Sequence, residues 1–368
     1  MKIILSIFLF VFLLLLTQYE KESFMNKKNE INKYYPVSLN LFDNDRRKLN
    51  VKTKVEKASE HYDYTTFVYN IFLDYNNKNL VLNGPPLLNN RPKYMKLDVF
   101  FNGEKMSLTS KKYTTHFYIL KYKVNEVKQL NEVKIKVGNT IKTVKIYKND
   151  YKCGDRILIT KQKNNKIRWI KDWIEYYTNR YNISNIVIFD NNSDNFNELK
   201  NSLMAYDNVT LIPYNYPFGI PKVFNTNFLQ YALLNIALDQ FCSENTYIFN
   251  FDIDEMLMVD PKHLNNILSS KDVYYKVRTW WVPMTLDKNN EYSFKDFKYK
   301  DSSSINKGEK YIVNKQSTSE LSVHFPKTRC KLKNDGGYFL HFRGISTNWK
   351  YNRLEKQSLD GLIKIDKL

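Results

Sequence analysis

Hydrophobic residues in the second half of the chain form short continuous runs, and stretches with helical spacing lie between them. The continuous runs predict buried strands at residues 157–159, 185–189, 208–212 and 247–251. Apolar positions recur with helical spacing from Ile170 to Tyr177 and again over residues 224–242. Continuous apolar strands that alternate with helices are typical of a parallel sheet. Residues 151–368 are therefore predicted to form an α/β domain, in which ligands bind beyond the carboxyl ends of the strands.

Strict alternation of apolar and polar residues indicates a different, β-rich region at residues 63–150. Apolar residues alternate with lysines over residues 133–137 and again beyond the Gly-Asn pair that follows, and an Asn-Gly pair at residues 102–103 indicates a second turn. Both pairs are typical of β-hairpins. We predict a small β-sandwich-like domain here, preceded by a polar stem or linker at residues 20–62.

The chain begins with an uncharged apolar run from Ile3 to Thr17. Its length is short for a membrane span, and residues 16–18 (Leu-Thr-Gln) make a poor cleavage site for a signal peptidase. We predict an uncleaved signal-anchor over residues 1–19, with a cleaved signal peptide as the alternative. The protein would then be a single-pass type II membrane protein with a luminal catalytic domain in secretory membranes of the Golgi or ER type, or a secreted protein after cleavage.

Composition narrows the choice of partners. Lysine and arginine exceed the acidic residues by 57 to 38, which gives a formal net charge of +19. The lysines are scattered and no recognition motif accompanies them, so no nucleic-acid partner is expected. Cys153, Cys242 and Cys330 lie far apart in the sequence, so a zinc site is not expected, and a disulfide between any two of them stays open.

Three acidic residues interrupt the last predicted strand, in the segment YIFNFDIDEMLM. Residues i and i+2 of an extended chain point to one face, so we expect Asp252 and Asp254 side by side and Ile253 in the core. Two carboxylates in close contact need a cation to stay ionised. Mn²⁺ or Mg²⁺ takes oxygen ligands and also bridges phosphate oxygens. The pattern therefore predicts a site that holds a nucleotide diphosphate as it leaves.

Two other interpretations of these acids stay open. They can form a solvated turn at the end of a strand. Haloacid-dehalogenase-type phosphatases also place two aspartates in an hhhDxDx(T/V) motif, where one is a nucleophile and the other an acid and base. The chain has both aspartates but carries Met256 where threonine or valine belongs. In that family the motif opens the fold, whereas three predicted strands precede it here.

The second half of the chain also carries four motifs in a fixed order: WIEYYTNRYNISNIVIFDNNSDN, FDIDEML, VHFP and FLHFRGISTNWKYNR. Together they resemble the glycosyltransferases of family 92 and their family 2-like relatives over residues 155–350. The resemblance implies a GT-A fold with a Rossmann-like, mostly parallel sheet. It also implies a nucleotide-sugar donor, most often UDP-linked, and a divalent cation, usually Mn²⁺. The implied reaction transfers a hexose to a glycan or glycoprotein acceptor, with inversion as a family-based expectation.

The resemblance implies roles for residues at the strand ends. Asp190 resembles the acid that contacts the nucleoside, although it also fits an ordinary turn. Thr160 is expected to line the same pocket. Asp252 and Asp254 resemble the metal and diphosphate site. Glu255 resembles the third acid that follows it, and a hydrogen bond to the backbone or to a neighbouring base is an equal alternative.

Later residues complete the expected site. Enzymes of this fold often add a histidine to the metal shell, and we assign this role to His324. His341 and Arg343 are expected near phosphate or acceptor, since arginine suits bidentate contact with anions. Trp280 and Trp281 are candidates for an acceptor platform, because aromatic faces stack on sugar rings, or else for core and lid positions.

An inverting reaction needs a carboxylate base near the acceptor hydroxyl. Asp287 and Glu320 are the two candidates, and the sequence does not choose between them. The chain also departs from the family, since Tyr176 and Tyr177 stand where histidine is common. A non-enzymatic glycan-binding or surface protein with vestigial acids is therefore the main alternative to a transferase.

Overall fold

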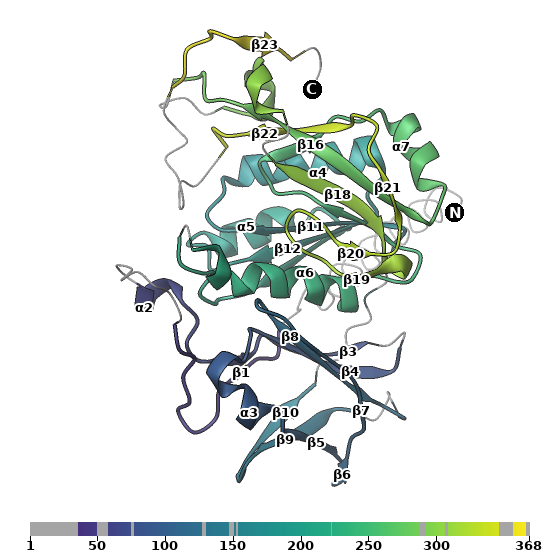
Figure 1. Ribbon diagram of the computed structural model, residues 1–368. Helices are drawn as coiled ribbons and strands as arrows, with labels where there is room; N and C mark the ends of the chain where they lie inside the picture. Colours follow the sequence, from purple (N-terminus) through teal and green to yellow (C-terminus); the bar gives the residue numbers. More distant parts are fainter. Residues whose placement is uncertain are drawn as a thin grey trace, which may run out of the picture. The chain divides into compact units, whose positions relative to one another are not determined.

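The computed structural model describes the chain in segments. The described residues are 36–49, 58–74, 77–126, 130–146, 151, 154–221, 223–287, 292–305, 308–345 and 356–365. The predicted signal-anchor at residues 1–19, most of the predicted stem and Cys153 lie outside them. Figure 1 labels the helices and strands that the text uses.

The first part of the described chain is built of antiparallel strands (Figure 1). One four-stranded sheet has the order β3-β4-β8-β7, from β3 (Asn70–Asp74), β4 (Asn79–Gly84), β7 (Leu108–Tyr113) and β8 (Tyr118–Lys123). A second has the order β10-β9-β5-β6, from β5 (Asp98–Phe101), β6 (Glu104–Lys105), β9 (Glu132–Val137) and β10 (Thr140–Lys145). The remaining elements are short: β1 (Leu39–Asn40), β2 (Thr66–Val68), α2 (Ala58–His61) and α3 (Arg91–Tyr94).

Both predicted hairpins are confirmed. Strand β9 pairs with β10 across Val137 and Thr140, and β5 pairs with β6 across Phe101 and Glu104. In the second turn Asn102 has φ 50° and Gly103 has φ 85°, as a two-residue hairpin turn requires. Side chains from both sheets contribute to one hydrophobic core. The β-rich character is therefore confirmed, while the sandwich packing and the domain boundaries stay predictions.

The second part contains a sheet of eleven strands within the described residues, and its main path runs β13-β12-β11-β14-β18-β16-β17-β23. The first four strands are parallel: β11 (Arg156–Gln162), β12 (Asn185–Asp190), β13 (Val209–Pro213) and β14 (Tyr247–Asn250). Beyond them the sheet is mixed, with β16 (Val273–Val282), β17 (Tyr299–Asp301), β18 (Glu309–Asn314) and β23 (Leu362–Lys364). All four predicted strands are thus confirmed, and the predicted α/β class is observed.

Among the described residues, shorter strands and four α-helices complete this part. The short strands are β15 (Glu255–Leu257), β19 (Thr318–Glu320), β20 (Lys327–Thr328), β21 (Lys331–Lys333) and β22 (Tyr338–Phe342). The helices are α4 (Ile167–Tyr181), α5 (Phe196–Leu203), α6 (Phe228–Gln240) and α7 (Pro261–Leu268). Helix α6 buries residues around its whole circumference, whereas α4 buries one face. Figure 1 shows α4 and α6 on different sides of β11 and β12.

The register of the parallel strands brings the candidate site together. Gln162 is paired with Asp190, and Ile159 with Asn250, so β11, β12 and β14 end at the same edge of the sheet. The carboxyl ends of parallel strands are where α/β proteins bind ligands. Asp252 follows the end of β14 and therefore lies at this edge of the sheet.

Strand β15, which follows the acids, is held from two directions. On one side it pairs with β22, with Glu255 opposite His341. On the other, the hydroxyl of Tyr177 in α4 donates to the Glu255 carbonyl oxygen and accepts from the Leu257 N–H, both at 3.1 Å. Tyr181 donates to the Leu257 carbonyl oxygen at 2.6 Å. Helix α4 thus fixes the backbone that carries the third acid.

One prediction is wrong. We expected a single-pass type II membrane protein with a luminal or secreted catalytic domain, but no helix in the part of the chain that the structure describes is long and apolar enough to cross a membrane. Residues 1–19, where the predicted anchor falls, are not among those residues.

The tyrosine contacts to β15 generate a stability prediction. Replacing Tyr177 by Phe leaves the buried Leu257 N–H and Glu255 C=O without this partner, so the free energy of unfolding should fall by about 1–3 kcal/mol in urea denaturation. As a control, the Tyr206 hydroxyl donates to the exposed Glu175 at 2.7 Å, and Tyr206→Phe should cost less than about 0.5 kcal/mol. Equal losses would contradict the anchoring role of Tyr177.

Candidate active site

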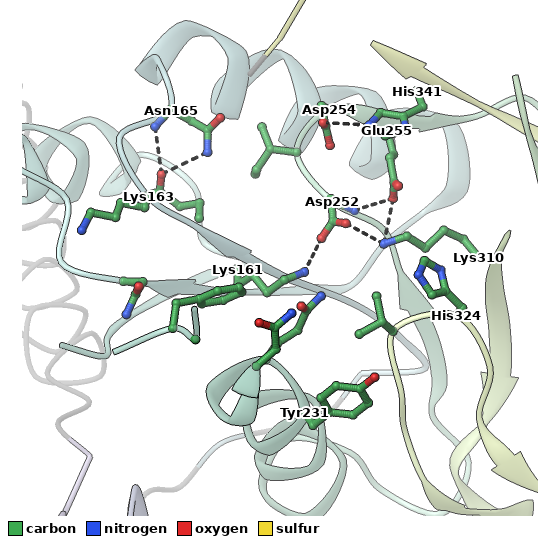
Figure 2. Close-up of a pocket in the computed structure, with 18 of the residues that line it drawn as sticks. Lys161, Lys163, Asn165, Tyr231, Asp252, Asp254, Glu255, Lys310, His324 and His341 are labelled. Carbon is green, nitrogen blue, oxygen red and sulfur yellow. Dashed lines mark hydrogen bonds and ion pairs between the residues drawn. The ribbon is translucent and has the colours of Figure 1, made fainter. Parts of the chain in front are cut away.

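A cavity of about 970 Å³ lies at the carboxyl edge of the parallel strands. It is lined by the ends of β11, β12 and β14 and by the N-terminal turn of α6, together with residues from β16, β18 and β22. Asp252, Asp254, Glu255, His324 and His341 all line it (Figure 2). The predicted acids and both late histidines therefore share one cavity.

Asp252 is bound by two lysines. Its Oδ1 lies 2.6 Å from the Lys161 ammonium and its Oδ2 lies 2.7 Å from the Lys310 ammonium (Figure 2). The Lys310 side chain is only 2% exposed, whereas that of Asp252 is 30% exposed. Although burial opposes ionisation of Asp252, the two ammonium groups hold the pKa of this carboxyl below its usual range. The carboxylate is therefore charged and satisfied within the protein.

Glu255 is joined to the same cluster. Its Oε2 lies 3.0 Å from the Lys310 ammonium and accepts from the Asp252 backbone N–H at 2.8 Å. Burial raises the pKa of the Glu255 carboxyl, and the Lys310 charge works against that shift. The second expectation for Glu255, a hydrogen bond to the backbone or to a neighbouring base, is thus observed in both forms. Its Oε1 has no hydrogen bond to a described residue.

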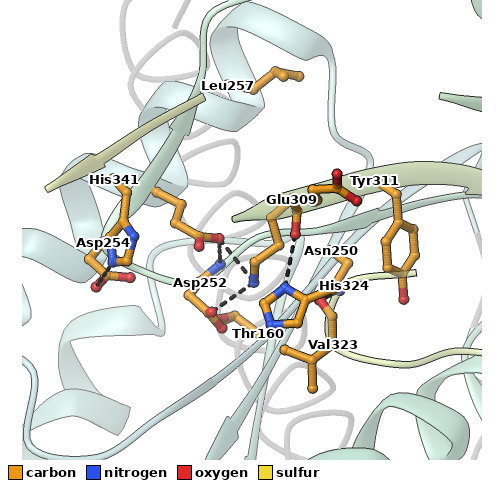
Figure 3. Close-up of polar contacts among 12 residues, drawn as sticks. Thr160, Asn250, Asp252, Asp254, Leu257, Glu309, Tyr311, Val323, His324 and His341 are labelled. Carbon is orange, nitrogen blue, oxygen red and sulfur yellow. Dashed lines mark hydrogen bonds and ion pairs between the residues drawn. The ribbon is translucent and has the colours of Figure 1, made fainter. Parts of the chain in front are cut away.

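Asp254 points away from the lysines and toward His341. Its Oδ2 lies 3.1 Å from the His341 Nε2 (Figure 3). Candidate ligand atoms of Asp254, Glu255 and His341 lie within 4.8 Å of one another. Two carboxylates and an imidazole form a donor set that suits Mn²⁺. Mg²⁺ prefers oxygen ligands and fits less completely. These three residues therefore fit a divalent cation.

The chain turns at this point, which differs from our expectation for the two aspartates. Strand β14 ends at Asn250, and the Glu255 N–H donates to the Asp252 carbonyl oxygen at 3.0 Å to close a turn. As a result Asp252 and Asp254 face different partners and do not stand side by side on one strand face. Ile253 is buried at 3% exposure, as expected.

His324, our choice for the metal shell, lies elsewhere in the cavity. Its Nδ1 is 3.1 Å from the backbone carbonyl oxygen of Glu309, and it is not part of the three-residue group (Figure 3). His341, which we expected near phosphate or acceptor, is the histidine of that group. The pairing of β15 with β22 brings His341 there, and this long-range register has no signal in the local sequence.

Asp190 and Thr160 are placed behind the cavity wall. Asp190 is 1% exposed, and it accepts hydrogen bonds from the Gln162 side-chain amide and from the Ser193 backbone N–H. Burial raises the pKa of this carboxyl, and the hydrogen bonds from Ser193 and Gln162 oppose the shift. The one hydrogen bond of the Thr160 hydroxyl to a described residue goes to the Lys161 backbone carbonyl oxygen, at 3.4 Å. Asp190 thus holds the loop together, and Asn191 next to it lines the cavity.

The two tryptophans point in opposite directions along β16. Trp281 lines the cavity, and the Arg343 guanidinium lies 4.1 Å from its ring centroid. Trp280 packs beside Tyr338 and lies under the Lys300 ammonium, and it does not line the cavity. Of the pair, only Trp281 is placed to meet a ligand in this cavity, with Arg343 behind it.

Neither candidate base lines the cavity. Asp287 is exposed and forms an ion pair with Lys356 at 2.7 Å. Glu320 in β19 forms an ion pair with Lys112 at 2.5 Å. Their assignment as bases stays a prediction that the site geometry does not favour.

Sequence reasoning missed Lys161 and Lys310, which are the direct partners of Asp252. Each lies near one end of a strand at the cavity, Lys161 in β11 and Lys310 in β18. Among 57 lysines and arginines no local pattern distinguishes them. Their positions near strand ends could have indicated them. That signal can be interpreted only when the order of the strands in the sheet is known.

Comparisons with known proteins give partial structural similarity. No protein-family model matches the chain, and no curated protein does. Among solved structures, HddC from Yersinia pseudotuberculosis is 13% identical with a TM-score of 0.30, over 51% of this chain and 93% of HddC. TarS 1-349 from S. aureus is 10% identical with a TM-score of 0.29, over 52% of this chain and 61% of TarS.

Two further matches bear glycosyltransferase names or ligands in their descriptions. TarS was also solved in complex with UDP-GlcNAc. WbbM, described as a bifunctional glycosyltransferase, is 15% identical with a TM-score of 0.25, over 44% of this chain and 26% of WbbM. At these TM-scores the similarity assigns neither a family nor an activity to the chain, and membership of family 92 stays a prediction.

The buried ion cluster generates a second stability prediction. Replacing Lys310 by Met removes the cation that Asp252 and Glu255 share. The free energy of unfolding should therefore fall by about 3–5 kcal/mol. In the matched control, Lys276 of β16 pairs with the partly exposed Glu309 at 2.5 Å, and Lys276→Met should cost at most about 1 kcal/mol. Urea denaturation of both variants measures the difference, and similar losses would show that the Lys310 cluster is not a buried anchor.

Proposed function

We propose that the protein is a metal-dependent glycosyltransferase that moves a hexose from a nucleotide sugar of the UDP-linked class to a glycan or glycoprotein acceptor. One observation carries the proposal: Asp254, Glu255 and His341 converge within 4.8 Å inside a large cavity at the carboxyl edge of an α/β sheet. The donor class rests on the four sequence motifs that resemble family 92 and family 2-like enzymes.

In this proposal the three converging residues hold Mn²⁺, with Mg²⁺ as a second possibility. Asp254 and Glu255 contribute carboxylate oxygens and His341 a neutral imidazole nitrogen. When bound, the ion supplies positive charge to the leaving diphosphate. Asn191 and Asn192 line the cavity beside β12 and are placed to bind the nucleoside, and Trp281 offers an aromatic wall for a sugar.

The phosphatase alternative is less consistent with the geometry. It requires Asp252 to attack phosphorus as a free carboxylate nucleophile. Both oxygens of Asp252 are instead held by ammonium groups at 2.6 and 2.7 Å. A carboxylate held in this way is a poor nucleophile. The glycan-binding alternative differs from our proposal in one measurable respect, because a binding protein does not turn over a nucleotide sugar.

The proposal predicts metal-dependent turnover. Incubation with Mn²⁺ and a panel of UDP-, GDP-, CDP- and ADP-sugars should release nucleoside diphosphate from one donor class, and excess EDTA should abolish the release until Mn²⁺ is restored. Turnover with EDTA present would contradict the metal requirement. No turnover with any donor, together with no Mn²⁺-dependent binding of any nucleoside diphosphate, would refute the transferase. Release of phosphate from simple phosphomonoesters would support the phosphatase.

The two histidines provide a paired prediction for the metal site. His341→Ala should weaken Mn²⁺ binding by at least about tenfold, since it removes a direct ligand. His324→Ala should leave Mn²⁺ affinity within about threefold, because His324 is not part of the group formed by Asp254, Glu255 and His341. Titration of Mn²⁺ by electron paramagnetic resonance on both variants measures this, and the reverse order would restore His324 as the ligand.

A further inference from the structure

Lys161 is a partly exposed lysine on the side of the cavity where the parallel strands end. It is the penultimate residue of β11, its side chain is 16% exposed, and it lines the cavity. An ammonium group has three N–H donors. Among the described residues Lys161 uses them on one partner, Asp252 Oδ1 at 2.6 Å (Figure 2). Two donors thus remain for a ligand that enters the cavity.

Lys310 also lines the cavity, but it differs from Lys161 in its exposure and in the number of its partners. It is 2% exposed, and its ammonium group is shared between Asp252 Oδ2 at 2.7 Å and Glu255 Oε2 at 3.0 Å. A buried cation with two carboxylate partners is part of the protein interior. Of the two lysines on Asp252, Lys161 is therefore the one that is accessible to a ligand.

Without a bound cation, the charges at this side of the cavity do not favour the binding of an anion. Asp252, Asp254 and Glu255 carry three negative charges when ionised, and the two lysines compensate two of them. A divalent cation at Asp254, Glu255 and His341 reverses the sign of the local charge. A diphosphate that enters would then meet a metal ion on one side and the free N–H groups of Lys161 on the other.

We propose that Lys161 is a phosphate ligand of the donor site, and that Asp252 is a positioning residue that holds Lys161 in place and does not bind the metal. The inference rests on the proposed function, because it requires a nucleoside diphosphate in this cavity. Asp252 keeps its bond to Lys161 when the ligand is bound, so no ion pair has to break on binding. The first aspartate of the D-x-D sequence thus acts through lysines and the second acts through the metal.

The test compares binding of UDP, in saturating Mn²⁺, by isothermal titration calorimetry. Lys161→Met should weaken UDP binding by about tenfold or more, because it removes a charge-assisted contact. Lys161→Arg should recover most of the loss. The control is Lys166→Met. Lys166 lies between β11 and α4, contacts the rings of Trp169 and Tyr292, and does not line the cavity. This substitution should change UDP affinity less than about twofold.

Mn²⁺ affinity without nucleotide separates a phosphate role from a structural one. Lys161→Met and Asp252→Asn should both leave it within about threefold and should both weaken UDP binding. Loss of Mn²⁺ affinity in Asp252→Asn, in protein that still unfolds cooperatively on heating, would make Asp252 a metal ligand and overturn its assigned role. Equal UDP affinity in Lys161→Met and Lys166→Met would overturn the role of Lys161.

The same measurements distinguish a failure of this inference from a failure of the proposed function. If the unmodified protein binds neither UDP nor GDP, CDP or ADP in the presence of Mn²⁺, the proposed function fails and the inference fails with it. If the unmodified protein binds UDP and Lys161→Met binds it equally well, only the inference fails. A loss in Lys161→Met that arginine does not restore would indicate a structural role and also refute it.

Discussion

Charge compensation at the end of β14 is the constraint on which this site depends. Three acids in four positions repel one another, and their repulsion grows where water is excluded. The Lys310 ammonium group compensates most of this repulsion, since it contacts both Asp252 and Glu255. The Lys310 side chain is 2% exposed. A buried cation of this kind is costly to desolvate and is retained only with good partners. The cluster therefore fixes the geometry of the turn before any ligand arrives.

The helix and strand around the turn also fix its geometry. Helix α4 reaches β15 through the hydroxyls of Tyr177 and Tyr181, which bind backbone atoms of that strand. On its other side β15 pairs with β22, and this pairing places His341 opposite Glu255. Tyr177 and Tyr181 thus have a structural role. They fix the strand on which the third acid and, through pairing, the histidine depend.

The sequence predicted the parts of this arrangement that local patterns encode. Continuous apolar runs gave the four parallel strands, and Asn-Gly and Gly-Asn pairs gave both hairpins, because strand burial and turn chemistry depend on neighbouring residues. Asp252 and Asp254, which the sequence indicated as site residues, both line the cavity. Lys310 and His341 were not found as their partners, because β18 and β22 reach the site only through long-range pairing. The two candidate bases lie in other ion pairs.

Glu255, the least explained of the three acids from sequence alone, connects the two halves of the site. Its Oε2 is bound by Lys310 and by the Asp252 backbone N–H, while its Oε1 has no hydrogen bond to a described residue. Glu255 therefore belongs to the internal ion cluster through Oε2 and is also part of the group with Asp254 and His341. Because Lys310 already holds Glu255 in place, a cation that binds this group does not have to order it. In the proposed function, the Lys310 ammonium thus lowers the entropic cost of binding a divalent cation at this group.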